Sequence, residues 1–416
     1  MSFAHLHLSA SLLQAVADRN YSTPTPIQSA AIPAILSGRD ILACAATGSG
    51  KTAAFALPIL QRLENVTGKG PRRVHALILV PTRELAAQVG ESFKAYARYF
   101  AQPTKVISVF GGVSINPQMM ALRGGADIVV ATPGRLLDLV EHNALRLDSV
   151  QTLVLDEADR LLDLGFADEL ARVLALLPRQ RQTVLCSATF PAEVNALAER
   201  LLRDPVRIEV PTTDANTPII EQRAIRVDVA KRTPLLRHLI EQQGWTRVLV
   251  FVATKYSAEH VADKLQRTGI KAAPFHGELS QGARTWTLAS FKTQQLQVLV
   301  ATDVAARGID IAQLPAVVNY DLPRSADDYT HRIGRTGRAG ESGIAVSFVS
   351  AGTEAHMRLI EKRHHLRLPR EVIPGFEPVE TENIPPAQTG AGGIKGKRKS
   401  KKDKLREAAA RGQQDQ

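Results

Sequence analysis

The sequence predicts an α/β protein with two tandem parallel-sheet domains joined by a short linker. Short apolar runs alternate with helical patterns over residues 39–350, as in parallel sheets with helices on both faces. With 416 residues, the chain is too long for one ordinary hydrophobic core. Residues 211–218 are polar, bounded by proline and without periodicity, which is typical of a linker.

These observations divide the chain into four parts. We expect the first domain over residues 1–211, the linker over 212–218 and the second domain over 219–368. Periodicity fades after residue 368, and residues 390–416 contain nine Lys and Arg against three Asp and Glu. This composition predicts a disordered basic tail over residues 369–416.

The apolar runs give the expected strands. In the first domain we expect strands at 40–45, 75–80, 105–110, 127–131, 152–156, 183–187 and 206–210. In the second domain we expect them at 222–229, 248–252, 272–276, 298–301, 316–320 and 344–349. Helical patterns lie between them, such as residues 83–100 and 258–266.

The composition favours a cytoplasmic globular protein that binds a polyanion. Hydrophobic residues make up 44% and charged residues 22% of the chain, which is near average usage. Cys44 and Cys186 are too few for a disulfide framework and lack metal-binding spacing. We expect no signal peptide and no membrane segment, because neither pattern occurs. The net charge of +11 indicates a polyanionic partner.

A glycine-rich loop is the first motif that indicates chemistry. Residues 45–52 read AATGSGKT and stand between an apolar run and a helical pattern. Such a turn presents backbone amides to phosphate. Lys51 would reach the β- and γ-phosphates, and the Thr52 hydroxyl would take Mg²⁺. Ala45 stands where the general motif has glycine, so the loop alone is a loose match.

A pair of carboxylates is the second motif. Residues 153–159 read LVLDEAD, an apolar run that ends in acids. Asp156 would hold Mg²⁺ through water, and Glu157 would polarise the attacking water. An Asp-Glu pair alone would also fit a solvated strand end. Downstream of a phosphate loop, the catalytic interpretation is favoured.

Closely spaced arginines mark the second domain. Residues 329–338 read YTHRIGRTGR, which sets bidentate donors among small glycines. Their expected use is to reach across a cleft to the nucleotide as arginine fingers. A solvated basic loop is the alternative.

Together these motifs resemble the DEAD-box RNA helicases of superfamily two, in family order across about residues 3–350. The tetrad Asp156-Glu157-Ala158-Asp159 gives that family its name. The resemblance implies two RecA-like domains, ATP and Mg²⁺ as cofactors, and RNA as a partner that is contacted through its backbone.

The resemblance also assigns residues to the nucleotide. Tyr21 would stack on the adenine, and Gln28 would hydrogen-bond its edge. The remaining nucleotide contacts would be Ala46, Thr47, Gly48, Ser49, Gly50, Lys51 and Thr52 in the loop, and Asp310 at the ribose. The catalytic residues would be Lys51, Asp156, Glu157 and the arginine fingers Arg335 and Arg338, with Thr52 and Asp156 at the metal.

A second set would bind RNA and couple it to hydrolysis. The resemblance assigns RNA contacts to Pro81, Thr82, Arg83, Gly111, Gly112, Thr132, Pro133, Gly134, Arg135, Thr254, Thr302 and Asp303. It assigns coupling to Ser187, Thr189, Arg307, His331 and Arg332. Taken singly, the turn and helix-start residues of the first domain would be ordinary turns or helix caps.

The departures from the family pattern are small. Ala46 stands where glutamine is common, and Asn20 replaces a glycine before Tyr21. Asparagine tolerates a left-handed backbone better than most residues, so we expect that turn to be kept. Residues 3–9 and the proline-rich segment after residue 367 look most like the bacterial RhlE-type branch.

The expected function is therefore an ATP-dependent RNA helicase that separates short duplexes locally, without long-range translocation. An ATP-gated RNA clamp or assembly factor is an alternative, and a DNA translocase of the same superfamily is a weaker one. A metal site at His356, His364 and His365 is disfavoured because they lack a compact ligand pattern. Protein partners in ribosome assembly and in RNA turnover are both compatible with the resemblance.

Overall fold

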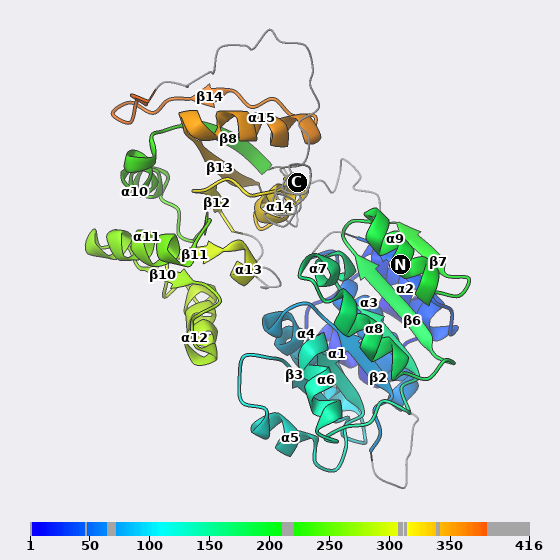
Figure 1. Cartoon of the computed structure of the whole chain (residues 1–416). Coiled ribbons are helices and arrows are strands. Elements are labelled where there is room, and N and C mark those ends of the chain that lie inside the picture. Colours follow the sequence, from blue (N-terminus) through cyan, green and yellow to red (C-terminus); the bar gives the residue numbers. More distant parts are fainter. Residues whose placement is uncertain are drawn as a thin grey trace, which may run out of the picture. The chain divides into compact units, whose positions relative to one another are not determined.

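The computed structural model describes residues 2–45, 48–64, 72–209, 220–306, 311, 314–337 and 342–380, and only the backbone of Asp327. The described chain forms two seven-stranded sheets in which every strand pairing is parallel (Figure 1). This confirms the predicted α/β class. Every expected strand is present, with small shifts at its ends. The expected linker and residues 381–416 of the expected tail lie outside the described residues.

The first sheet has the strand order β3-β4-β2-β5-β6-β1-β7. Its strands are β1 (Ile41–Cys44), β2 (Ala76–Leu79), β3 (Val106–Val109), β4 (Ile128–Ala131), β5 (Thr152–Leu155), β6 (Gln182–Ser187) and β7 (Val206–Glu209). Its helices are α1 (Ala10–Ala17), α2 (Pro26–Leu36), α3 (Lys51–Glu64), α4 (Arg83–Tyr96), α5 (Asn116–Leu122), α6 (Pro133–Glu141), α7 (Ala158–Asp163), α8 (Ala167–Ala175) and α9 (Ala192–Leu201).

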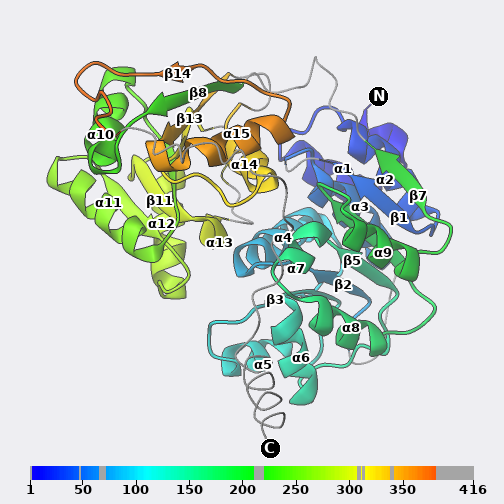
Figure 2. The ribbon, with the colours of Figure 1, turned by 45° about the horizontal axis from the view of Figure 1, so that its top comes forward.

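Helices cover both faces of this sheet, which explains why its central strands β2, β4 and β5 are almost wholly apolar. Ile78 packs into a core with α1 to α4, whereas its neighbours Leu77 and Leu79 pack into a second core with α6, α8 and α9. Figure 2 shows these helices on the two sides of the sheet. Because successive side chains point to opposite faces, a continuous apolar run fills both cores.

The second sheet has the order β10-β11-β9-β12-β13-β8-β14. Its strands are β8 (Ile220–Arg226), β9 (Val248–Val252), β10 (Ala272–Phe275), β11 (Val298–Thr302), β12 (Ala316–Asn319), β13 (Gly343–Val349) and β14 (Arg370–Glu371). Its helices are α10 (Arg232–Gln243), α11 (Lys255–Arg267), α12 (Gln281–Lys292), α13 (Asp303–Ala306), α14 (Ala326–Ile333) and α15 (Glu354–Arg363). Among the helices that the structure describes, none is both long and apolar enough to cross a bilayer.

The second sheet is also buried on both faces. Val250 packs against α10 and α11, whereas Leu249 and Phe251 face a core with α12 and α13. A smaller cluster joins α14 and α15 to Ala345 of β13. This arrangement repeats the layers of the first sheet.

One expected boundary is wrong. Residues 369–379, expected to be part of a disordered tail, pack on the second domain. Arg370 and Glu371 form β14 beside β8, and the Val379 amide donates to Asp228 Oδ2 at 2.8 Å. The Arg370 guanidinium pairs with Glu361 at 2.7 Å and with Glu354 at 3.0 Å. A two-residue strand has too little periodicity to be detected in a sequence, so the described fold extends further than expected.

Replacing Arg370 with methionine should lower the free energy of unfolding of the second domain by about 3 kcal/mol, since two largely buried carboxylates lose their counter-charge. Both tryptophans of the chain, Trp245 and Trp286, belong to this domain. Urea unfolding of the full chain, followed by tryptophan fluorescence, therefore reports on it. Arg363→Met, an exposed position at the end of α15, is the matched control. Equal losses in both variants would contradict the assignment.

The same network predicts a pH dependence. Burial raises the pKa of Glu354 and Glu361, but the hydrogen bonds and charge of Arg370 outweigh it and hold both pKa values below 4.5. A carboxylate with a lowered folded pKa stabilises the fold at neutral pH, and this contribution is lost as the pH falls through that value. The stability difference between wild type and Arg370→Met should shrink as the pH falls below 4.5. A constant difference would mean that Arg370 contributes by packing alone.

Candidate functional site

The phosphate loop lies between β1 and α3, at the carboxyl edge of the first sheet. Gly48 and Gly50 have φ values of 83° and 93°, which glycine adopts without steric cost. α3 begins at Lys51, whose ammonium is buried and donates to the Ala45 carbonyl at 2.6 Å. The loop therefore joins a helix N-terminus to a buried cation, a combination suited to phosphate. Ala46 and Thr47 lie outside the described residues.

Gln28 is held against this loop. Its Nε2 donates to the Gly50 carbonyl at 3.2 Å, and its Oε1 accepts from the Thr25 amide at 2.9 Å. A Cβ at Gly50 would lie 2.4 Å from Gln28 Nε2, so only glycine permits this approach. Tyr21, seven residues before Gln28, has a side chain that is 40% exposed. Asn20 has the expected left-handed backbone, with φ of 56°.

The carboxylates follow β5. Burial raises the pKa of Asp156 to about 6, although the Lys51 ammonium acts in the opposite direction. Glu157 has φ of 52°, an uncommon value for glutamate, and such strained residues cluster at functional sites. Its Oε2 is buried and lies 3.4 Å from Arg160 Nη1 without hydrogen-bond geometry. Glu157 therefore keeps acceptor capacity for water or substrate.

Asp159 joins the carboxylate segment to the coupling motif. Its Oδ2 accepts from the amides of Ala188 and Thr189 at 3.2 and 3.0 Å and from the Thr189 hydroxyl at 3.0 Å. The Ser187 hydroxyl accepts from the Asp159 amide and donates to the Thr189 carbonyl. Asp159 is thus a positioning residue that the motif assignments leave without a role, although its place in the tetrad is a signal for it in the sequence.

The expected RNA contacts of the first domain lie mainly at helix starts and in one loop. Thr82 caps α4 by accepting from the Leu85 amide at 3.3 Å, and Pro133 is the first residue of α6. Gly112 has φ of 76°, and a Cβ there would lie 2.7 Å from Arg83. These positions agree with phosphate contacts, which helix N-termini and glycine amides make well. Pro81 is buried, whereas Gly111 and Gly134 are half-buried.

Arg135 differs from the others because its side chain is buried. Its Nη2 donates to the Val113 carbonyl at 2.7 Å, and its Nε lies 3.4 Å from Asp138. This bond ties α6 to the loop that contains Gly111 and Gly112. Thr132 is also buried, at 8% exposure. Arg135 therefore holds in place the face at which we expect RNA, and RNA contact by Arg135 and Thr132 is a prediction.

In the second domain, Thr254 caps α11 and is exposed, whereas Thr302 and Asp303 are half-buried at the end of β11. Arg332 pairs with both oxygens of Asp303, at 2.6 and 2.7 Å, and also donates to Asn319 and to the Asp321 carbonyl. Arg332 therefore fixes Asp303 and has few donors left for a ligand.

The arginine-finger segment is described in part. Arg335 is buried, and its carbonyl accepts from the Leu314 amide at 3.2 Å. Burial lowers the pKa of His331 to about 4, and nearby Arg160 acts in the same direction, so the imidazole is neutral at physiological pH. Arg307, Asp310 and Arg338 lie outside the described residues.

Side chains of the two domains also contact each other. Arg284 donates to Glu84 at 2.8 Å, and both side chains are buried. Arg83 donates to Gln281 at 3.0 Å. No local pattern pairs these positions, because about 200 residues separate them.

Comparison with known proteins agrees with this geometry. The family model for "DEAD/DEAH box helicase" matches residues 25–197, and that for "Helicase conserved C-terminal domain" matches residues 230–340. The ATP-dependent RNA helicase DeaD of Mycobacterium tuberculosis is 42% identical over 92% of this chain and 67% of that protein. The chain belongs to the DEAD-box helicase family.

A second sequence relative and a solved structure are also similar to this DEAD-box chain. The DEAD-box ATP-dependent RNA helicase CshA of Bacillus cereus is 40% identical over 90% of this chain and 70% of that protein. The structure of S. cerevisiae Dbp5 bound to RNA and ADP BeF3 is 32% identical, covers 89% of this chain and 95% of that chain, and has a TM-score of 0.78. The two sheets are therefore RecA-like domains, as the resemblance implied.

Gln28→Glu should weaken ATP binding by about tenfold or more, since a carboxylate cannot donate to Gly50 or offer both a donor and an acceptor to adenine. GTP binding should change less, so the ratio of the two dissociation constants is the measurement. Gln118→Glu is the matched control. The Gln118 side chain makes two hydrogen bonds of the same kind, because its Oε1 accepts from the Phe110 amide and its Nε2 donates to the Phe110 carbonyl. An unchanged ratio would contradict the assignment of Gln28 to the adenine.

Asp159→Asn should keep nucleotide binding but reduce RNA-stimulated hydrolysis by about tenfold or more. Both oxygens of Asp159 accept from N–H groups, Oδ1 from Arg160 and Oδ2 from Ala188 and Thr189. An asparagine amide would face a donor in either orientation. Titration with nucleotide and the ATPase rate in saturating RNA separate the two effects. Asp168→Asn, an exposed acid on α8, is the control.

Proposed function

We propose that this chain hydrolyses ATP in response to RNA and uses the cycle to separate short RNA duplexes locally. The observation that carries the proposal is a set of hydrogen-bonded segments at one edge of the first sheet. The Lys51 loop, the Asp156-Glu157 pair and Ser187-Thr189 follow three adjacent parallel strands. Asp159 bonds the carboxylate segment to the coupling motif.

The residues present fit ATP. The glycine turn exposes amides, Lys51 supplies a buried positive charge, and the Ser49 hydroxyl is buried without a hydrogen-bond partner among the described residues. Gln28 offers an amide beside the loop for a base edge. These groups match phosphate at one end of the nucleotide and adenine at the other. Asp310 would hold the ribose.

The donors also fit Mg²⁺. The Thr52 hydroxyl and the Asp156 carboxylate are hard oxygen ligands, which Mg²⁺ prefers. When bound, Mg²⁺ neutralises charge on the phosphates. Glu157 would orient the attacking water through its free acceptor capacity, while Lys51, Arg335 and Arg338 would stabilise the charge on the transferred phosphoryl group.

RNA would bind through its phosphates. The expected contacts are amides, hydroxyls and arginines, which position a strand without a base code. Binding should therefore be indifferent to sequence and should weaken with salt. The basic segment after residue 380 would raise the local RNA concentration as a tether. Coupling would pass through Ser187 and Thr189 on one side and through His331, Arg332 and Arg307 on the other.

Finer assignments rest on the sequence. We place the chain in the RhlE-type branch and in the cytoplasm, with protein partners in ribosome assembly or RNA turnover. The branch is supported by the segment at residues 3–9 and the proline-rich segment after residue 367, and the cytoplasm by the two cysteines without a disulfide framework. Partners in ribosome assembly and in RNA turnover are both compatible with the resemblance to DEAD-box helicases. An ATP-gated RNA clamp is the second candidate function, since the same residues would close on RNA whether or not strands separate.

The ATPase rate of the full chain without nucleic acid, with single-stranded RNA and with DNA of matched sequence tests the proposal. We expect stimulation by RNA alone. Glu157→Gln should lower the RNA-stimulated kcat by at least about 100-fold, because water loses its positioning group. Glu91→Gln, an exposed acid on α4, is the control.

Each contrary outcome has a meaning. Equal stimulation by DNA would favour a translocase of the same superfamily. Hydrolysis without separation of a short RNA duplex would favour the clamp. Stimulation by neither nucleic acid would overturn the proposal.

A further inference from the structure

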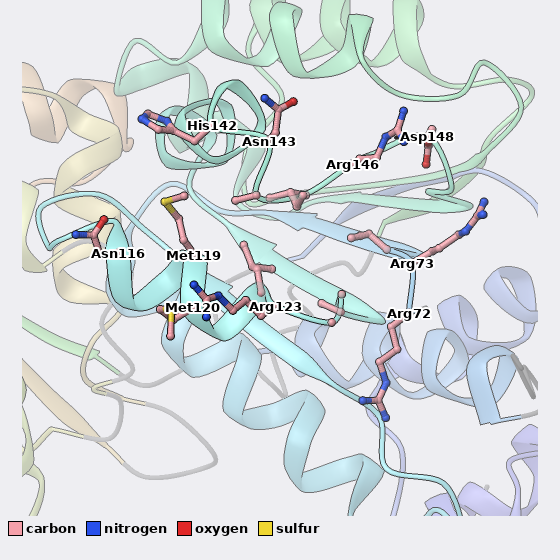
Figure 3. Close-up of a pocket in the computed structure, with 17 residues that line it drawn as sticks. Arg72, Arg73, Asn116, Met119, Met120, Arg123, His142, Asn143, Arg146 and Asp148 are labelled. Carbon is pink, nitrogen blue, oxygen red and sulfur yellow. Dashed lines mark ion pairs between the residues drawn. The ribbon is translucent and has the colours of Figure 1, made fainter. Parts of the chain in front are cut away.

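A basic hollow lies at the amino edge of the first sheet, whereas the phosphate loop lies at the carboxyl edge. It has a volume of about 850 Å³ and is lined by the segments before β2 and β4, by α5 and by the segment after α6 (Figure 3). Four of its side chains are arginines: Arg72, Arg73, Arg123 and Arg146. The nucleotide chemistry uses none of them.

Two of these arginines lie beside a carboxylate, and the other two are available to a ligand. Arg72 lies 3.2 Å from Asp127, and Arg146 lies 3.6 Å from Asp148. Arg73 and Arg123 are exposed, and within the part of the chain that the structure describes their guanidinium groups form no hydrogen bond or ion pair. Exposed guanidinium forks are suited to phosphate, which they bind with two parallel hydrogen bonds.

The rest of the lining suits the flat, apolar faces of nucleotide bases. Met120 is 54% exposed, and Leu122 and Leu145 lie buried beneath the surface. Figure 3 shows Met119, Met120 and Asn116 grouped with Arg123, and Arg73 with Arg146 and Asp148 on the other side. Apolar atoms between positive groups match a nucleotide, which joins a flat base to a phosphate.

Two helices lead from the hollow to the expected RNA contacts. α6 begins beside Thr132 and ends at Glu141, next to His142 in the hollow, and α5 runs from the loop after Gly112 to Leu122. Nine residues of α6 span about 13.5 Å. A stacked strand advances about 3.4 Å per nucleotide, so about four nucleotides separate the two ends.

We propose that this hollow is a second RNA-binding site, which holds the phosphates of the strand that flanks the segment bound at the motif residues. The proposal rests on the proposed function, since it extends the same RNA path. RNA is favoured over an acidic peptide because both helices lead from the hollow to the expected phosphate contacts. Arg73 and Arg123 would be the main contacts, while Arg72 and Arg146 keep their carboxylate partners.

The test compares two single-stranded oligouridylates, a short one that spans the motif contacts and one longer by about four nucleotides at each end. Fluorescence anisotropy gives the affinity of the full chain for each strand at several salt concentrations. The variant is Arg73→Ala/Arg123→Ala. Arg179→Ala is the matched control, because Arg179 is exposed at the same sheet edge, before β6, and does not line the hollow.

We expect the double variant to bind the short strand normally and to lose most of the extra affinity for the long strand. The slope of log K against log salt for the long strand should become shallower by about 1.4, since each phosphate contact contributes about 0.7. ATPase stimulation by the short strand should be unchanged in all variants.

Other outcomes overturn the proposal separately from the proposed function. Equal affinity of wild type and the double variant for the long strand would refute the second site, even if both strands stimulate hydrolysis. Binding of an oligoglutamate peptide that is lost in the double variant, with RNA binding unchanged, would assign the hollow to an acidic protein segment. If neither strand stimulates hydrolysis, the proposed function itself fails.

Discussion

The parallel register of β1 against β6 is the constraint on which the nucleotide site depends. Cys44 pairs with Ser187, so the phosphate loop and the coupling motif leave the sheet at the same level. A slip of one residue would move every side chain of β1 to the opposite face and lose both cores. The buried carboxylate of Asp40 helps to fix this register at the other edge, because it accepts from the amides of Thr183 and Arg203 at 2.7 and 2.8 Å.

Several site residues also complete the fold, which links stability to function. Thr82 and Thr254 cap α4 and α11 while they present hydroxyls at the expected RNA face. Arg135 donates to the Val113 carbonyl and so holds the loop after β3 in place. Arg332 donates to the Asp303 carboxylate and so fixes its position. A loss of activity at these positions therefore needs a separate measurement of stability before it is assigned to a ligand contact.

Local patterns made much of this protein predictable. Short apolar runs indicated the central strands, because a strand buried on both faces needs apolar residues at nearly every position. The loop before Lys51 and the acids after β5 were recognisable because their residues are consecutive in the chain. Contacts between distant residues were not. Asp159 meets Thr189 across 30 residues, and Arg370 meets Glu354 across 16, at spacings that no helix or strand period reports.

The net charge of +11 also does not reveal where a polyanion binds, because that depends on contacts between distant residues. Arg160 is paired with Glu157, Arg72 with Asp127 and Arg332 with Asp303, so these positive charges stabilise the fold and attract a polyanion only weakly. What attracts RNA is the subset of cations without an internal partner, and the sequence does not reveal which arginines belong to it. Arg73 and Arg123 differ from Arg72 and Arg146 only in their surroundings, because a carboxylate lies beside the second pair. The distribution of partners, rather than the total charge, therefore decides where a strand binds.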